Sequence, residues 1–230
     1  IVFIIIGYVT VGLRFATITA ILLAFIGATG MWMHSMITLS SVLVSVLICF
    51  VIGVPLGVIA SYNKWYRDIQ NVVLDAMQTL PYFCYLIPVL MFFGGNIVSA
   101  VIATVIYSVP PIIRLTALGL SQVSGGYSEV SKSFGGTGIQ TLNKVKFPLA
   151  VPSLVMGFNQ TVIMAFAMQI VTPLIGGKGL GLQVFNALQR SDTGRGLSAG
   201  LAIVLLAIII DRITHAWTKK QRQALGLDQS

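Results

Sequence analysis

Charged residues are scarce in this sequence. Only 9% of the 230 residues are Asp, Glu, Lys or Arg, whereas a soluble domain usually carries about 25%. So few charged side chains cannot cover a surface that faces water on every side. The scarcity excludes an ordinary water-soluble enzyme or binding domain.

Groups that carry out chemistry are equally scarce. The two cysteines, Cys49 and Cys84, stand singly inside apolar blocks without the spacing of metal ligands, and we expect both to be packing residues. His34 and His215 are expected at opposite membrane faces rather than in a catalytic site. No H-E-x-x-H motif occurs, and no G-K-[ST] follows the glycines of "SFGGTGIQ". We therefore expect no enzyme activity, metal or cofactor in this chain.

Acidic groups are missing from the apolar runs as well. Proton- or sodium-coupled carriers use buried acids or histidine relays. The runs contain no glutamate and offer no fixed charge pair, since Asp75 opens its run and Asp211 stands beside Arg212 near the end of the last one. A secondary transporter or channel stays an alternative, but we expect the energy for any transport to come from a partner.

Long apolar runs are what the sequence does contain. Hydrophobic residues make up 56% of the chain, in runs of roughly 20, the length at which a helix crosses a ~30 Å hydrocarbon core. The runs lack the alternation of membrane β-strands. The fold class predicted is therefore all-α, a polytopic membrane protein, with seven spans near 1–13, 15–33, 36–60, 70–93, 97–121, 150–175 and 196–217. Because the chain starts at Ile1 inside an apolar run, we expect upstream sequence to be missing.

The formal charge of +8 is distributed unevenly between the predicted loops. Eleven basic residues fall on one side of the membrane and three on the other, namely Lys178, Arg190 and Arg195. The positive-inside rule makes the eleven-residue side cytoplasmic. The charge thus reports topology, and we expect membrane lipid and no nucleic acid as a partner.

Prolines and small residues mark particular spans. Pro81 and Pro88, and then Pro110 and Pro111, lie inside predicted spans, where proline removes a helical hydrogen bond. They indicate either helices broken around a pathway or ordinary kinks. "GVPLG" from Gly53, and "GLSAG" near the C-terminus, place small residues where helices approach closely. Packing within one subunit is the favoured interpretation, and a dimer seam is the alternative.

Residues 122–149 form a long polar loop between two spans. Val123, Tyr127, Val130 and Phe134 recur at helical spacing and predict one amphipathic helix, which "GGTG" ends. A second apolar stripe follows, and Pro148 is expected to end it and to begin the return to the membrane; the stripe consists of Ile139, Leu142, Val145 and Leu149. Such helices can lie on lipid or fill a groove on a soluble partner.

The spacing within this loop resembles the "EAA" loop of ABC-importer permeases, which reads E-A-A, three residues, G, nine residues, I-x-L-P. Glu129, Gly135 and Pro148 match at their places. Milder substitutions occupy the other positions, namely Val130, Ser131, Val145 and Phe147. In that family the glutamate-bearing helix is the coupling helix, which docks in a cleft of the ATPase subunit.

The resemblance extends over most of the chain. "LDAMQTLPYFCYLIPVLMFFG", "PPIIRLTALGL", "FNQTV" and "GGKGLG" are similar to the permease of glycine betaine/proline-type osmoprotectant importers. This implies one type I (MetI-like) ABC-importer transmembrane domain over residues 1–230, with 122–149 as its cytoplasmic coupling loop. It also implies a homodimer in the bacterial inner membrane, two ATPase subunits that bind ATP and Mg, and an external substrate-binding protein.

The resemblance implies a small osmolyte with a quaternary nitrogen or N-oxide, and glycine betaine first. Proline betaine, choline, carnitine, trimethylamine N-oxide and an amino acid stay open. Aromatic rings attract quaternary ammonium groups through cation–π interactions, so Tyr82 and Tyr85 are candidates for the translocation path, although packing is the commoner role of such aromatics. Gln78 and Asn159 are candidate polar lining groups.

Overall fold

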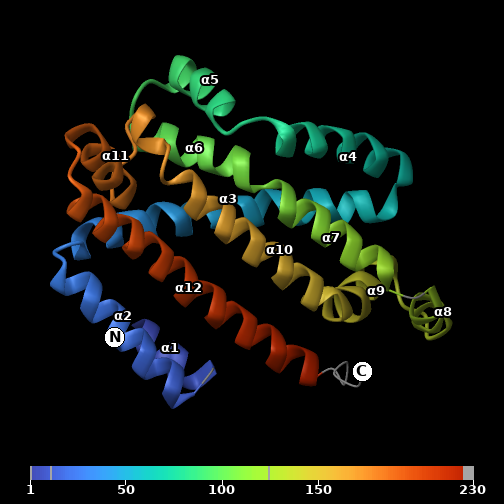
Figure 1. The fold of residues 1–230 in the computed structure, drawn as a ribbon. Helices are drawn as coiled ribbons and strands as arrows, with labels where there is room; N and C mark the ends of the chain where they lie inside the picture. Colours follow the sequence, from blue (N-terminus) through green and yellow to red (C-terminus); the bar gives the residue numbers. More distant parts are fainter. Residues whose placement is uncertain (1, 11, 124, 225–230) are drawn as a thin grey trace.

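The computed structural model describes residues 2–10, 12–123 and 125–224, and the regular elements in these ranges are all helical (Figure 1). The helices are α1 (Val2–Thr10), α2 (Leu13–Ala28), α3 (Trp32–Tyr62), α4 (Lys64–Thr79), α5 (Phe83–Phe93), α6 (Ile97–Ser108), α7 (Pro110–Gln122), α8 (Gly125–Ser133), α9 (Gly138–Thr141), the π-helix η1 (Leu142–Lys146), α10 (Phe147–Met168), the 3-10 helix η2 (Thr172–Ile175), α11 (Leu180–Arg190) and α12 (Thr193–Ala224). The predicted all-α class is confirmed.

Fewer helices cross than the seven predicted. Within the described residues, four helical stretches are long and apolar enough to span a membrane, and the bent pair α4–α5 offers a fifth crossing. The first two predicted spans fold instead as the short helices α1 and α2, which pack against each other. At 1.5 Å per residue, the 16 residues of α2 extend about 24 Å, less than a ~30 Å hydrocarbon core.

Proline breaks one of the predicted spans, at Pro81. The run predicted at 70–93 is two helices that meet at 97°, and Pro81 lies in the break between them. Pro88 lies inside α5. Pro110 and Pro111 open α7, where a missing N–H costs little. The prediction of a broken helix is therefore confirmed at Pro81.

Helix α7 packs most extensively against α3 and α10, and glycine makes the close approach possible. A Cβ atom at Gly57 of α3 would lie 2.7 Å from the carbonyl oxygen of Ile113 in α7. One at Gly119 of α7 would lie 2.6 Å from the Cβ of Ser153 in α10. The first small-residue motif thus serves helix packing inside one subunit, as the favoured interpretation held.

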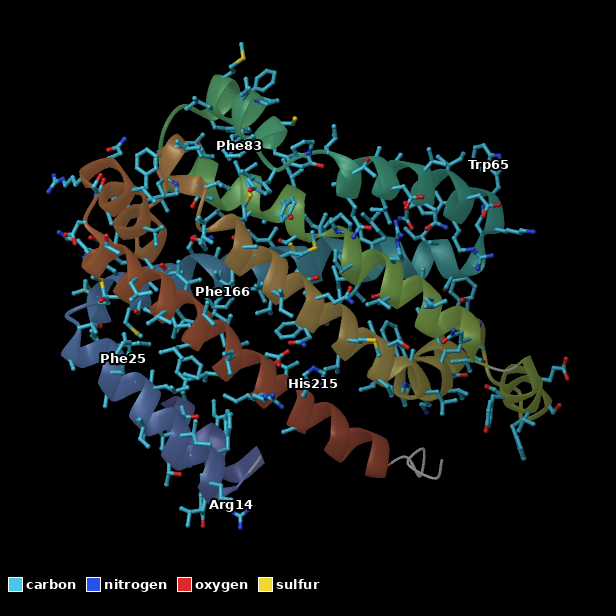
Figure 2. All side chains as sticks on the ribbon, in the orientation of Figure 1. Arg14, Phe25, Trp65, Phe83, Phe166 and His215 are labelled. Carbon is cyan, nitrogen blue, oxygen red and sulfur yellow. The ribbon has the colours of Figure 1, made fainter. Side chains whose placement is uncertain are left out.

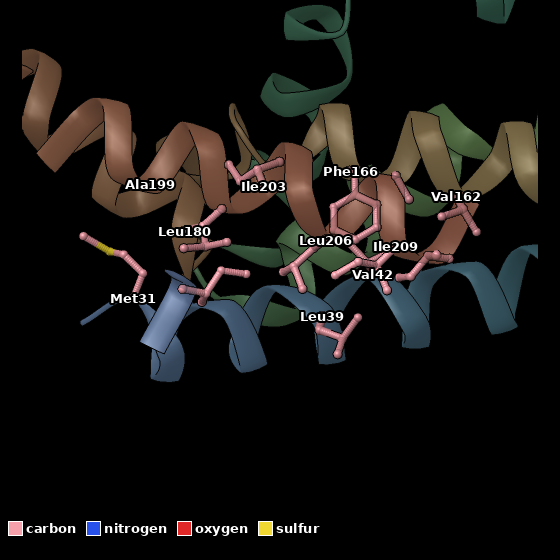
Figure 3. Packing of buried hydrophobic residues seen from close by; sticks show 14 of the residues in the cluster. Met31, Leu39, Val42, Val162, Phe166, Leu180, Ala199, Ile203, Leu206 and Ile209 are labelled. Carbon is pink, nitrogen blue, oxygen red and sulfur yellow. The ribbon is translucent and has the colours of Figure 1, made fainter. Parts of the chain in front are cut away.

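A large apolar cluster joins α3, α10 and α12, with α2 at its edge. Figure 3 shows Val42, Phe166, Leu206 and Ile209 meeting between these helices. In contrast, Trp65 and Phe83 lie on the outside of α4 and α5 (Figure 2). Cys49 is buried as predicted, but Cys84 is exposed on α5 and is not a core residue of this chain.

The connections gather at two ends of the bundle. The α3–α4 turn, α8 and α9 lie at one end, whereas α5 and α11 lie at the other (Figure 1). Two of the loops predicted to be basic, the α3–α4 turn and the α8–α9 region, therefore share an end, as the charge argument requires. That this end faces the cytoplasm stays a prediction.

Candidate functional site

Helix α8 carries the predicted apolar stripe at one end of the bundle. It begins at Gly125, so the prediction that Val123 starts the stripe is wrong, since Val123 is the extended residue that ends α7. Tyr127 and Val130 are exposed, and the side chain of Phe134 is 88% exposed. Glu129 is exposed on the same short helix. Large apolar side chains therefore stand uncovered beside the glutamate.

A glycine turn ends α8, as predicted. Gly135 has φ of 76°, a left-handed conformation that glycine adopts without strain. The Gly136 N–H donates to the Ser131 carbonyl at 2.9 Å, the long-range bond of a Schellman helix end. The hydroxyls of Ser131 and Thr141 also lie 2.8 Å apart. These two bonds fix the angle between α8 and the next helix.

The segment after the turn is the beginning of a membrane helix. Thr137 caps it, with a reciprocal pair of hydrogen bonds to Gln140, and the helix then runs without interruption from Gly138 to Met168. The prediction that Pro148 ends the second segment is therefore wrong. Pro148 stands in the first turn of α10, directly after the π-helical stretch η1. The wider π turn removes the need for the N–H that proline lacks.

The start of this long helix is anchored in the bundle. Leu142 and Phe147 pack against the buried cluster that contains Leu120. Val145 is half-buried. The ammonium group of Lys146 lies 4.9 Å from the ring centre of Tyr62, at the end of α3. The loop thus has an uncovered part, α8, and an anchored part from Leu142 onward.

Three of the four residues predicted for the path lie on either side of the break between α4 and α5: Gln78 on α4, Tyr82 just before α5 and Tyr85 on α5. Gln78 and Tyr82 are exposed, and the hydroxyl of Tyr85 donates to the Met77 carbonyl. The rings of Tyr82 and Tyr85 each lie 6.2 Å from the ring of Tyr107 on α6. The sequence interpretation missed Tyr107, although its position close before Pro110 was a usable signal.

Asn159 lies apart from that group, in the contact between α10 and α12. Its side chain is 7% exposed, and its amide donates to Asp211 at 2.6 Å. The same nitrogen lies 3.2 Å from His215 (labelled in Figure 2). Asp211 thus bonds Asn159 and His215, not the neighbouring Arg212.

An ion pair links α4 to α7. Nη2 of Arg114 lies 2.7 Å from Oδ1 of Asp75. The expectation that the spans offer no fixed charge pair is therefore wrong. It failed because each charge was assigned to the end of a span, whereas the bend at Pro81 sets α4 beside α7. The side chains of Arg114 and Asp75 are 38% and 62% exposed.

Residues 53–223 match the family described as binding-protein-dependent transport system inner membrane component. The chain belongs to this family. Its members are inner membrane components of transport systems, and the several apolar helices make the chain a multi-pass integral membrane protein of such a system.

Relatives that are named as transport permeases align along most of the chain. It is 42% identical over 222 residues to the glycine betaine/proline betaine transport system permease protein ProW of Escherichia coli (strain K12). This alignment covers 96% of this chain and 63% of ProW. It is 45% identical over 191 residues to the glycine betaine/carnitine transport permease protein GbuB of Listeria monocytogenes serotype 1/2a (strain 10403S), covering 83% and 68%. The chain thus spans somewhat less than two thirds of ProW.

The fold has a solved counterpart. A chain of the MetNI methionine ABC transporter, in an inward-facing crystal form, aligns with a TM-score of 0.73 at 22% identity. The alignment covers 80% of this chain and 93% of that one. The predicted MetI-like fold is confirmed, and the likeness extends to the fold alone.

Proposed function

We propose that this chain is the pore subunit of an ATP-driven ABC importer for quaternary-amine osmolytes, with glycine betaine as the first candidate. The names of ProW and GbuB support glycine betaine over the methionine of the structural relative. Two copies of the permease would form the pore. An external binding protein would select the solute and deliver it.

The observation that carries this proposal is the uncovered stripe of α8 beside Glu129. Burying a side chain such as Phe134 is worth about 1.5–3 kcal/mol, and this chain leaves it open to solvent. A groove on an ATPase subunit would cover the stripe, in the manner of a helix-in-groove contact. We assign the coupling role to Glu129, Val130, Ser131, Gly135, Val145 and Pro148.

The geometry also supplies a route for movement into the membrane. Because the helix from Gly138 to Met168 is continuous, a displacement of α8 passes through the glycine turn into a helix that spans the bilayer. ATP and Mg bound by the partner ATPase would drive that displacement. The chain itself would contribute the helix that transmits the displacement and the path for the solute, whereas the partner would hydrolyse ATP.

The route for the solute is assigned to the face that carries Gln78, Tyr82 and Tyr85. Exposed polar and aromatic side chains gather there on either side of the helix break. The amide of Asn159 donates to Asp211 of α12, so we assign Asn159 first to the contact between α10 and α12 and second to the path. Carnitine is the second candidate solute, because the GbuB name includes it.

Reconstitution in liposomes tests the function. The vesicles would contain the permease together with its ATPase and its binding protein, with ATP supplied on the side that the ATPase faces. The experiment then compares the uptake of radiolabelled glycine betaine, carnitine, choline, trimethylamine N-oxide and methionine. We expect ATP-dependent uptake of betaine, lost in Glu129→Ala although the complex still folds. Uptake of methionine alone would overturn the solute assignment and keep the importer. Uptake without ATP would overturn the importer.

A further inference from the structure

The ion pair between Arg114 and Asp75 lies well inside the helices α7 and α4, about two to three turns from the helix ends that face α8. Arg114 stands eight residues before the end of α7 at Gln122, which is about 12 Å at 1.5 Å per residue. Asp75 stands eleven residues after the start of α4 at Lys64, or about 16 Å. Both α4 and α7 have these termini at the α8 end of the bundle (Figure 1). For helices whose ends lie at the edge of a ~30 Å hydrocarbon core, these distances correspond to positions near its middle.

The exposure of this pair identifies what its surroundings must be. Neither side chain as a whole is buried in this chain, although Nε of Arg114 is a buried atom and has no hydrogen-bond partner among the described residues. Charged groups at mid-membrane depth face a bundle interior or a water-filled cavity, not lipid. The face between α4 and α7 therefore lines a watery path or meets a second copy of the permease across one.

The same face carries the three tyrosines. Val109 keeps a right-handed helical conformation between α6 and α7, so Tyr107 and Arg114, seven residues apart, lie on one side two turns from each other. Helical side chains lean toward the N-terminus, which for Arg114 is the direction of Tyr107. The rings of Tyr82 and Tyr85 meet Tyr107 from α5.

We propose that Arg114 is an exchangeable carboxylate site for a zwitterionic solute, with Asp75 as the group that occupies it at rest. The solute carboxylate replaces Asp75 on the guanidinium, and the faces of Tyr82, Tyr85 and Tyr107 attract its quaternary ammonium group. This proposal rests on the proposed import of quaternary amines. It assigns recognition of the carboxylate to the permease itself.

The charges balance in this exchange. A guanidinium holds carboxylates through charge-assisted, often bidentate hydrogen bonds, so one carboxylate replaces another on Arg114. The displaced Asp75 carboxylate, which is 62% exposed, is then solvated by water. The tyrosine rings supply the cation–π attraction that an ammonium group favours. Choline carries the same ammonium group but no carboxylate, so it gains nothing from Arg114. The site therefore separates betaines from choline.

The test compares the two halves of the ion pair. Radiolabelled glycine betaine and choline would be bound to the permease–ATPase complex in lipid nanodiscs without the binding protein. A hydrogen bond between charged groups is worth roughly a factor of ten in affinity. Asp75→Asn removes the competitor and is expected to bind betaine about tenfold more tightly, whereas Arg114→Gln binds it at least about tenfold more weakly. Choline binding changes less than about twofold in both.

The opposite directions of the two variants are the signature, because a purely structural ion pair would weaken binding in both. Asp68→Asn, an exposed acid two turns earlier on α4, is the matched control and leaves both affinities unchanged. Gel filtration verifies assembly, and Arg114→Lys replaces Arg114→Gln if the latter does not assemble. Weaker betaine binding in Asp75→Asn, equal effects on choline, or no betaine binding in any form overturns the proposal. Uptake by the wild-type transporter with its binding protein is measured separately, so failure of the site and failure of the function are distinguishable.

Discussion

The two ends of the bundle are built in opposite ways. At the α8 end, a nine-residue helix exposes its apolar stripe and is joined to the rest through one glycine turn and a hydroxyl pair. At the α11 end, the backbone N–H of Leu180 donates to the buried Thr38 hydroxyl at 2.8 Å. A Cβ atom at Gly181 would lie 1.8 Å from the Gln169 carbonyl oxygen. Helix α8 therefore leaves its apolar side chains for a partner to cover, whereas α11 is held by contacts within its own chain.

A polar chain reinforces the α11 end. Nε of Arg195 donates to Oε1 of the buried Gln183 at 2.9 Å, and the Gln183 amide lies 3.3 Å from Nδ1 of His34. Because the arginine can only donate, the amide nitrogen faces His34 and donates to it. These contacts border a cavity of about 340 Å³ that His34 and Arg195 help to line. Under the proposed coupling, movement would enter the chain at α8 and be resisted at α11.

The largest effect is expected where the chain packs most tightly. Gly181→Ala places a methyl group inside the contact distance of the Gln169 carbonyl, so one backbone segment must move. We expect loss of most folded, detergent-stable protein, measured by fluorescence-detected gel filtration. Gly200→Ala is the control, since no atom lies within 4 Å of the added Cβ. A well-folded Gly181→Ala protein would mean that the α11 end is as adaptable as the α8 end.

The second-largest effect is expected at the exposed apolar side chains of the α8 end. Phe134→Ala removes the most exposed apolar side chain of the stripe, and large interface side chains typically contribute 2 kcal/mol or more, about 30-fold in affinity. We expect the ATPase subunit to bind the permease about 30-fold more weakly in a pull-down titration or by interferometry. Phe92→Ala is the matched control, because Phe92 is 83% exposed on α5 at the other end. Equal losses in both variants would contradict the assignment of α8.

A smaller effect is expected at the turn. Ala at Gly135 meets no neighbouring atom within 4 Å, so the cost comes from the positive φ alone, of the order of 1–3 kcal/mol. Gly135→Ala should lower ATP-dependent uptake about tenfold while ATPase binding is retained. Gly138→Ala, also without close neighbours and outside the positive-φ glycines, should stay within about twofold. Loss of ATPase binding in Gly135→Ala would show that the turn shapes the docking surface rather than transmitting its movement.

The same contrast explains what sequence could and could not predict. Periodicity and glycine spacing located α8 and its turn because both depend on local backbone preferences. The continuation through Pro148 was missed, since a π-helical stretch has no sequence signature. The Arg114–Asp75 pair was missed because it joins residues 39 positions apart, across a bend whose angle periodicity does not give. The second predicted span, 15–33, is the shorter helix α2, because apolar composition alone does not show where a helix ends.

The smallest effect concerns the contact between Lys146, just before α10, and Tyr62 at the end of α3. Lys146 stands over the exposed ring of Tyr62, and such a cation–π contact at an exposed site is worth about 0.5–1 kcal/mol. Tyr62→Leu should lower the melting temperature of the purified permease by a few degrees at most, roughly 1–4 °C for a chain of this size. Tyr62→Phe keeps the aromatic face and should restore the wild-type value. A loss of folded protein as severe as that expected for Gly181→Ala would contradict this small effect. It would show that Tyr62 anchors the start of α10 against α3 without any ATPase, so that the chain holds its α8 end as firmly as its α11 end.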